Sequence, residues 1–194
     1  FIGEESPLTV TQMLWVNPIM DTFAALALAS LPPTKAVMDE KPRSVNEHIL
    51  KGIYSGILGV GGIFTAVLLG ICIYFQHTDI TCLTDIFTGA AQWGANNGLS
   101  AYELGLFFTI FVMLQFWNLF NAKAFMTGGS AFKGISWKDT EWFMIIALVI
   151  LGGQIVMTEM PGVQEMFNVA EGGVKFVDWL IIIGATSLVL WIGE

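Results

Sequence analysis

The chain has 194 residues, of which 55% are hydrophobic and only 12% are charged. Soluble domains carry roughly 25% charged residues, so this composition argues against a water-soluble fold and predicts an integral membrane protein that contacts the lipid bilayer. The net charge of −8 argues against a nucleic acid as partner.

The first predicted membrane span covers about residues 6–31 and carries polar groups near its middle. Asn17, Pro18 and Asp21 interrupt a stretch that is otherwise long and apolar enough to cross a bilayer. A carboxylate at membrane depth costs on the order of 2.5–3.5 kcal/mol on insertion scales, so it usually has a partner or a function. Asn17 and Asp21 are four residues apart and share one face of a helix. This pattern favours a cation-binding face.

Four further runs with few charges predict membrane helices. They cover about residues 52–75, 104–122, 142–158 and 176–193. The last run has Trp179 near its start and Trp191 near its end, which are positions typical of aromatic anchors at the membrane surface. The predicted fold is therefore an all-α, integral membrane bundle of five transmembrane helices.

Glycines are concentrated in the second span. Gly52 and Gly56 form a GxxxG pair, and Gly59, Gly61 and Gly62 follow. They suit either a hinge or a close-packed helix face, and packing is favoured because small residues commonly mediate helix contacts in membranes.

Polar residues recur in the third span and in the connection before it. Gln115 and Asn118 share a helix face, where they serve either interhelical hydrogen bonding or ligand binding. A short helix is predicted at about residues 85–93, with Trp93 at the membrane surface. His77 has no second His or Cys nearby in sequence and is interpreted as an ordinary exposed histidine.

The basic residues are distributed unevenly among the connections. Connections 34–51 and 123–138 contain seven of the eight Lys and Arg residues, whereas the connections after the second and fourth spans contain only Lys175. By the positive-inside rule, the two basic connections are cytoplasmic. The first residue is then expected outside the membrane and the C-terminus in the cytoplasm.

No motif for soluble catalysis is present. The sequence lacks a GxxxxGKS/T phosphate loop, a dinucleotide-binding GxGxxG after a strand, and a HExxH metal motif. The residues alone therefore predict a membrane helix bundle with a polar site on its first helix, of the kind that suits a cation.

Two stretches resemble P-type cation pumps, particularly calcium-transporting ATPases of the plasma-membrane subfamily. The run QMLWVNPIMDTFAALALASLPPTKAVMDEKPRSVNE, residues 12–47, is similar to helix six and the following loop of that family, whose pattern is QMLWVNLIMDTxAxLALATEPP. Pro18 stands where the family usually has Leu, and Ser30 and Leu31 replace Thr-Glu. VMLQFWNLFNAK resembles helix eight, and the other spans fit helices seven, nine and ten by layout. Residues 1–194 are thus expected to form a C-terminal transmembrane domain.

The resemblance implies a role for three side chains. Asn17 and Asp21 match the ion-coordinating Asn and Asp of helix six, and Gln115 is a third candidate ligand. A carboxylate and an amide both supply oxygen, which suits a hard cation such as Ca²⁺. Helix six is locally unwound in this family, and Pro18 favours such a break. Related pumps with two calcium sites carry Thr and Glu where this chain has Met20 and Gln115, so one calcium ion per cycle is expected.

The resemblance also implies partners that this chain lacks. The family's phosphorylated Asp, its nucleotide-binding and actuator domains, and helices one to five lie upstream, so ATP and Mg²⁺ belong to the complete protein only. This fragment is expected neither to hydrolyse ATP nor to pump, and the complete protein is expected in the plasma membrane. Two alternatives stay open: a pump of the same superfamily for Mn²⁺, Na⁺ or H⁺, or a non-enzymatic membrane module whose polar residues join helices.

Overall fold

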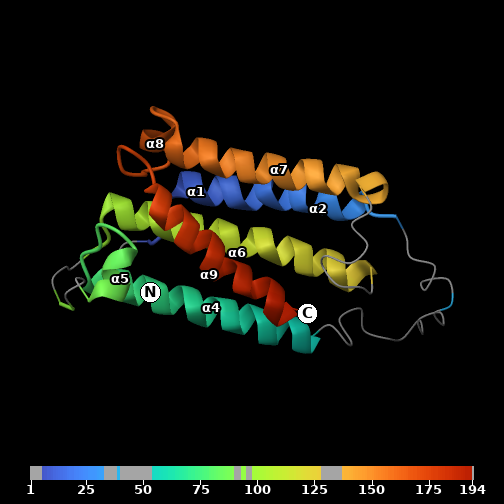
Figure 1. Cartoon of the computed structure of the whole chain (residues 1–194), viewed down its shortest axis with the longest axis horizontal. Coiled ribbons are helices and arrows are strands. Elements are labelled where there is room, and N and C mark those ends of the chain that lie inside the picture. Colours follow the sequence, from blue (N-terminus) through green and yellow to red (C-terminus); the bar gives the residue numbers. More distant parts are fainter. Residues whose placement is uncertain are drawn as a thin grey trace.

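The computed structural model of the chain describes residues 6–32, 39, 54–89, 93–94, 98–127 and 137–193. Among these residues the structure is helical, and an isolated antiparallel bridge joins Thr78 to Trp93. The helices, in chain order, are α1 (Val10–Leu14), the π-helix η1 (Trp15–Met20), α2 (Asp21–Ala29), α4 (Tyr54–His77), α5 (Thr84–Thr88), α6 (Ala101–Thr127), α7 (Trp137–Glu159), α8 (Val163–Met166) and α9 (Phe176–Gly193). Figure 1 shows them as a bundle of long, roughly aligned rods.

The predicted all-α membrane class is confirmed. Three helical stretches are long and apolar enough to cross a membrane: Leu58–His77, Ala101–Phe125 and Thr140–Glu159. A shorter apolar helix, Phe176–Trp191, corresponds to the last predicted span. The first predicted span is present as the consecutive segments α1, η1 and α2, which Figure 1 shows as one continuous rod. The count of five spans is therefore approximate.

Some sequence predictions fall outside the described residues. These include the basic connection at 34–51 apart from Asp39, the part of the second basic connection at 128–136, and Gly52 of the GxxxG pair. The membrane orientation inferred from the basic connections stays a prediction.

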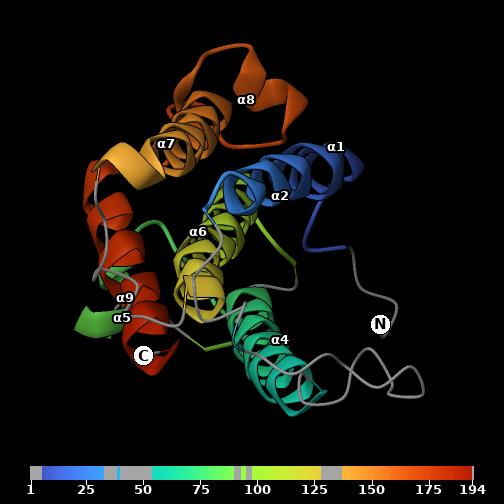
Figure 2. The same ribbon diagram turned by 90° about the vertical axis from the view of Figure 1, so that its right-hand side faces the viewer.

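The centre of the bundle is α6. It contacts α2, α4, α7 and α9, and Figure 2 shows it between α2 and α7 on one side and α4 and α9 on the other. Its sequence is rich in large apolar side chains on all sides, including Phe107, Phe108 and Met113, which are fully or almost fully buried. A helix that is hydrophobic all round belongs in a core, so α6 provides the frame on which the other helices are placed.

Three glycines of α4 have no close neighbour at their Cβ positions among the described residues. A Cβ atom added at Gly59, Gly61 or Gly62 would meet nothing within 4 Å. Most of α4 is exposed, in contrast to the largely buried α6. The interpretation of these glycines as a packing face therefore stays a prediction.

The connection after α4 contains a shorter helix than predicted. α5 covers only Thr84–Thr88, because Gly89 adopts a left-handed conformation with φ of 72° and ends the helix. His77 is exposed, and its ring stacks on Trp93 with 5.3 Å between the ring centroids. Its exposure agrees with the interpretation as an ordinary surface histidine.

Candidate cation site

The first membrane segment changes its hydrogen-bond pattern at Pro18. A proline has no backbone N–H, so the carbonyl of Leu14 loses its usual partner four residues on. Residues Trp15–Met20 adopt a π-helix, in which carbonyls bond five residues ahead, and the N–H of Asp21 accordingly donates to the carbonyl of Val16. The irregularity lies where the sequence predicted a break. The helix widens into a π-turn here and does not unwind into an open segment. Each backbone N–H in the turn bonds to a carbonyl five residues earlier instead of four, so the backbone groups stay paired.

The carboxylate of Asp21 lies directly after this turn. Asp21 is the first residue of α2, while Asn17 lies within η1, and both side chains are exposed in the described part of the chain. The hydroxyl of Thr22 donates to the carbonyl of Pro18 and so pairs a carbonyl next to the break. The turn therefore presents a carboxylate and an amide in the middle of an apolar segment.

Asp21 lines a cavity of about 370 Å³ between η1, α2, α4, α6 and α7. Its polar lining residues are Asp21, Gln115 and Asn118. The rest of the lining is apolar and includes Phe64 of α4 and Leu28 of α2. The structure thus brings two of the three predicted site residues, Asp21 and Gln115, into one cavity.

Asn17 is not among the residues that line this cavity. Asn118 is among them, although sequence reasoning left its role open. The available signal was its spacing of three residues from Gln115, which places both amides on one face of α6. The sequence could not show that this face is turned toward Asp21.

The donor set suits part of a cation site. Carboxylate and amide oxygens are typical ligands of hard cations such as Ca²⁺, which takes 6–8 oxygens. Among the described residues, no group of three or more His, Cys, Asp or Glu side chains is arranged to hold a metal. A cation at Asp21 would therefore take its remaining oxygen ligands from amides, backbone carbonyls or other segments of the complete protein.

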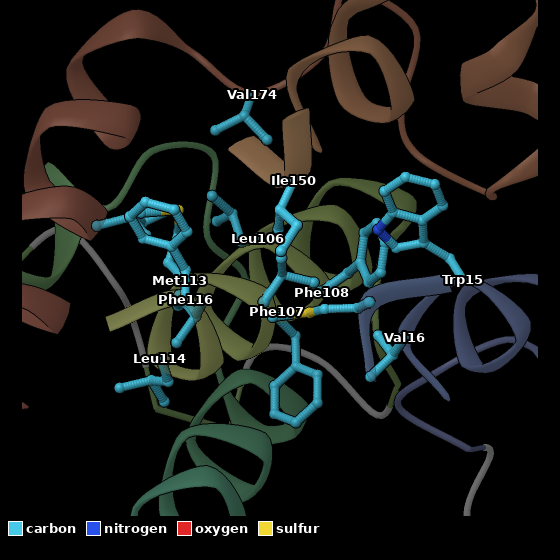
Figure 3. Packing of buried hydrophobic residues seen from close by; sticks show 14 of the residues in the cluster. Trp15, Val16, Leu106, Phe107, Phe108, Met113, Leu114, Phe116, Ile150 and Val174 are labelled. Carbon is cyan, nitrogen blue, oxygen red and sulfur yellow. The ribbon is translucent and has the colours of Figure 1, made fainter. Parts of the chain in front are cut away.

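The π-helix packs against α7 through Trp15. The backbone of Gly153 approaches the indole so closely that a Cβ atom there would lie 2.7 Å from Cη2 and 2.8 Å from Cζ2 of Trp15. Trp15 belongs to the buried hydrophobic cluster that also contains Phe108 and Ile150 (Figure 3). This contact fixes the start of the turn that presents Asn17.

We expect Gly153→Ala to disturb the contact between Trp15 and α7 and to destabilise the complete protein by about 1–3 kcal/mol. The reason is that the added methyl group overpacks against a buried ring. The midpoint of thermal unfolding in detergent measures the effect. The control is Gly152→Ala, since a Cβ atom at Gly152 meets nothing within 4 Å. Equal midpoints for the two variants would contradict the proposed contact.

Two carboxylates, Asp178 and Glu159, hold the opposite end of the bundle together. Asp178, in the first turn of α9, is 0% exposed. It accepts hydrogen bonds from the backbone N–H of Leu83 (2.9 Å), the thiol of Cys82 (3.0 Å) and the hydroxyl of Tyr102 (2.5 Å). One carboxylate therefore joins the connection around α5 to both α6 and α9.

A second carboxylate, Glu159 at the end of α7, binds the start of α9. It accepts hydrogen bonds from the backbone N–H of Val174 (3.2 Å) and from the indole of Trp179 (2.8 Å). Trp179 is only 9% exposed and its indole N–H is paired with Glu159 inside the bundle, which does not fit the predicted role as a membrane-surface anchor. Trp191 is 70% exposed, as an anchor requires.

Outside the membrane spans, Asp85 stabilises the start of α5. The hydroxyl of Thr81 (2.9 Å) and the backbone N–H groups of Cys82 (3.0 Å) and Thr81 (3.2 Å) donate to its carboxylate. These hydrogen bonds, with that of the Thr81 hydroxyl as the largest contribution, hold the pKa of Asp85 below its usual range. The carboxylate therefore stays ionised at neutral pH.

Comparison with known proteins gives consistent similarities. Residues 5–194 match the family described as "Cation transporting ATPase, C-terminus". The chain is 35% identical over 96% of its length to Calcium-transporting ATPase 2 of Cryptococcus neoformans and 32% identical over 94% to Calcium-transporting ATPase PAT1 of Dictyostelium discoideum. It is 31% identical over 97% to Plasma membrane calcium-transporting ATPase 3 of Rattus norvegicus. The chain spans 12%, 16% and 14% of the lengths of these relatives.

Proposed function

This chain belongs to the family of cation-transporting ATPase C-terminal regions, and on that premise we propose that it supplies part of the intramembrane calcium site of an ATP-driven calcium export pump. The observation that carries the proposal is the cavity at the π-helix, where the carboxylate of Asp21 lies with the amides of Gln115 and Asn118. The names of the relatives supply the identity of the ion, because each is called a calcium-transporting ATPase.

Three side chains are proposed as calcium ligands: Asn17, Asp21 and Gln115. Asp21 supplies the negative charge that offsets part of the cation's desolvation in the membrane, and the amides supply neutral oxygens. Asp21 and Gln115 share the cavity. Asn17 lies in η1 (Trp15–Met20), directly before Asp21, but does not line the cavity, so its assignment rests on the similarity of this stretch to the helix-six motif.

In the complete pump, the upstream helices and cytoplasmic domains would provide the remaining ligands, the phosphorylated aspartate and the site for ATP and Mg²⁺. The chain described here would then neither hydrolyse ATP nor transport calcium alone. Its place would be the plasma membrane, with its first residue outside and its C-terminus in the cytoplasm, as the basic connections favour.

The test is phosphorylation of the full-length protein from ATP in the presence of single cations. We expect Ca²⁺ at micromolar concentrations to stimulate phosphoenzyme formation, with Mg²⁺ present throughout. Stimulation by Mn²⁺ or Na⁺ instead, or a dependence on pH alone, would assign the pump to another cation. No phosphoenzyme under any cation would favour a non-enzymatic membrane module.

We further expect one calcium ion per transport cycle. Met20 and Gln115 lie in the cavity wall where a hydroxyl and a carboxylate would support a second ion, and neither carries a charge. The measurement is the ratio of bound radioactive calcium to the maximal phosphoenzyme in the same preparation. A ratio of two would contradict the proposal.

A further inference from the structure

The side chain of Gln12 ties the first membrane segment to the connection that follows α7. Gln12 lies in α1 and is 0% exposed. Its amide nitrogen donates to the carbonyl of Phe167 at 2.7 Å, and its amide oxygen accepts from the backbone N–H of Thr9 at 2.9 Å. Both ends of this buried amide are therefore paired, and one of them joins two segments that lie far apart in the sequence.

The same connection also packs against α6. The ring of Phe167 stacks on the ring of Phe108, with 6.1 Å between the centroids. Two residues later, Val169 lies against Gly105, where an added Cβ atom would be 3.0 Å from Cγ1 of Val169. The helix that leads into this connection, α8, lies beside α1 in both views of the bundle (Figures 1 and 2). Residues 167–169 therefore contact α1 through a hydrogen bond and α6 through side-chain packing.

The backbone turns sharply between these contacts. Asn168 has a φ of 52°, in the left-handed region that asparagine tolerates better than most residues. Its side chain is exposed, whereas Phe167 and Val169 on either side are buried. The backbone N–H of Val169 donates to the carbonyl of Gln164 at 2.9 Å, which holds the turn to α8. With this turn, the carbonyl of Phe167 meets α1 while the neighbouring side chains meet α6.

The two helices that meet this connection also carry the polar lining of the cation cavity. Asp21 comes nine residues after Gln12, and Gln115 comes seven residues after Phe108. At 1.5 Å of rise per residue, both lie about 10–14 Å along their helices from the connection. We propose that Gln12 is a positioning residue for the cation site: its bond to the Phe167 carbonyl fixes the helix that carries Asp21 against α6. This inference rests on the proposed function.

The bond matters to the site because one ion needs oxygens from both helices at the same time. Calcium is bound at short distances by 6–8 oxygens. If the helix of Asp21 is free to move relative to α6, the ion must first order the two helices, and this ordering reduces the affinity. Losing the bond should therefore weaken cation binding although every proposed ligand is still present.

The test uses Gln12→Met in the full-length pump. Methionine has a similar length but no amide, and the backbone N–H of residue 12 keeps its bond to the hydroxyl of Thr9. We expect the calcium concentration for half-maximal phosphorylation to rise about three- to tenfold, the factor that corresponds to one net hydrogen bond. The maximal phosphoenzyme should stay near the wild-type amount. Hydrogen exchange at the backbone amides of residues 9–13 should become faster, because the N–H of Thr9 loses its acceptor and the helix loses its anchor.

Gln164→Met is the matched control. Gln164 is a buried glutamine of α8, in the same connection, but its amide donates to the carbonyl of Thr158 in α7 at 2.8 Å. The variant therefore loses a hydrogen bond of the connection without releasing α1. We expect its half-maximal calcium concentration and its exchange at residues 9–13 to equal those of the wild type. A wild-type half-maximal concentration in Gln12→Met, or the same rise in both variants, would overturn the inference.

Gln12→Glu decides if Gln12→Met does not fold, which would appear as a loss of maximal phosphoenzyme at every calcium concentration. An ionised carboxylate keeps the acceptor for the N–H of Thr9 and removes the donor to Phe167. A rise in the half-maximal concentration is again expected, and a wild-type value overturns the inference. If another cation drives the wild-type pump, the proposed calcium function fails. The half-maximal concentration of that cation then decides in the same variants, and the exchange measurement does not depend on the ion.

Discussion

Replacing Asp21 by Asn in the full-length pump is expected to abolish the stimulation of phosphoenzyme by micromolar calcium. The substitution keeps the shape of the side chain and removes its charge. Asp21 is the single carboxylate among the residues that line the cavity in the described part of the chain. A divalent cation in a low-dielectric site loses several kcal/mol when a charged ligand becomes neutral, so we expect the half-maximal calcium concentration to rise about a hundredfold or more.

The control for this prediction is Asp85→Asn. Asp85 is also a carboxylate in the first turn of a helix, but α5 lies between α4 and α6, and Asp85 accepts hydrogen bonds from Thr81 and Cys82. Its substitution should leave the half-maximal calcium concentration unchanged. Normal calcium stimulation in Asp21→Asn would remove Asp21 from the site and, with it, the basis for assigning calcium to the cavity.

The position of Asp21 within a membrane span was predictable, because a charged residue in an apolar run can be recognised from the linear sequence alone. Hydropathy fixes the spans without reference to their packing, and a proline inside a span predicts a disturbed hydrogen-bond ladder at Pro18. The form of the disturbance was not predictable in the same way. A proline removes one N–H, and whether the chain opens or shifts to a π-helix depends on how its neighbours hold it, here through the contact of Trp15 with Gly153.

The contacts that polar residues make with distant parts of the chain could not be predicted from the sequence, for a related reason. Trp179 has the spacing of a lipid-facing anchor, but its indole donates to Glu159, twenty residues earlier in the chain. Asn118 has the spacing of a residue that bonds a neighbouring helix, yet it lines the cavity with Asp21. Periodicity identifies the face of a helix on which a residue lies, whereas the packing of the other helices decides what that face meets.

The contacts of Asp178 could not be predicted from the sequence either. Removing its side chain is expected to cause a large loss of stability. Its carboxylate holds the backbone N–H of Leu83, the thiol of Cys82 and the hydroxyl of Tyr102. Asp178→Ala would leave the buried N–H of Leu83 and the partly buried Cys82 and Tyr102 donors without this acceptor. Hydrogen bonds to charged groups contribute about 1.5–3 kcal/mol each. We therefore expect a loss of about 3–5 kcal/mol in stability, which also exceeds the effect expected for Gly153→Ala.

This loss should be local to the end of the bundle that contains α5 and the start of α9. Asp178 joins the connection around α5 to α6 and α9, so its removal frees that connection before the rest unfolds. The measurement is the thermal midpoint of the full-length protein together with the rate of proteolysis between α4 and α6. Glu171→Gln is the control, because Glu171 is an exposed carboxylate in the connection before α9. A midpoint and a cleavage rate equal to those of this control would show that Asp178 does not hold the connection, whereas a faster cleavage with normal calcium stimulation would separate this structural role from the cation site at Asp21.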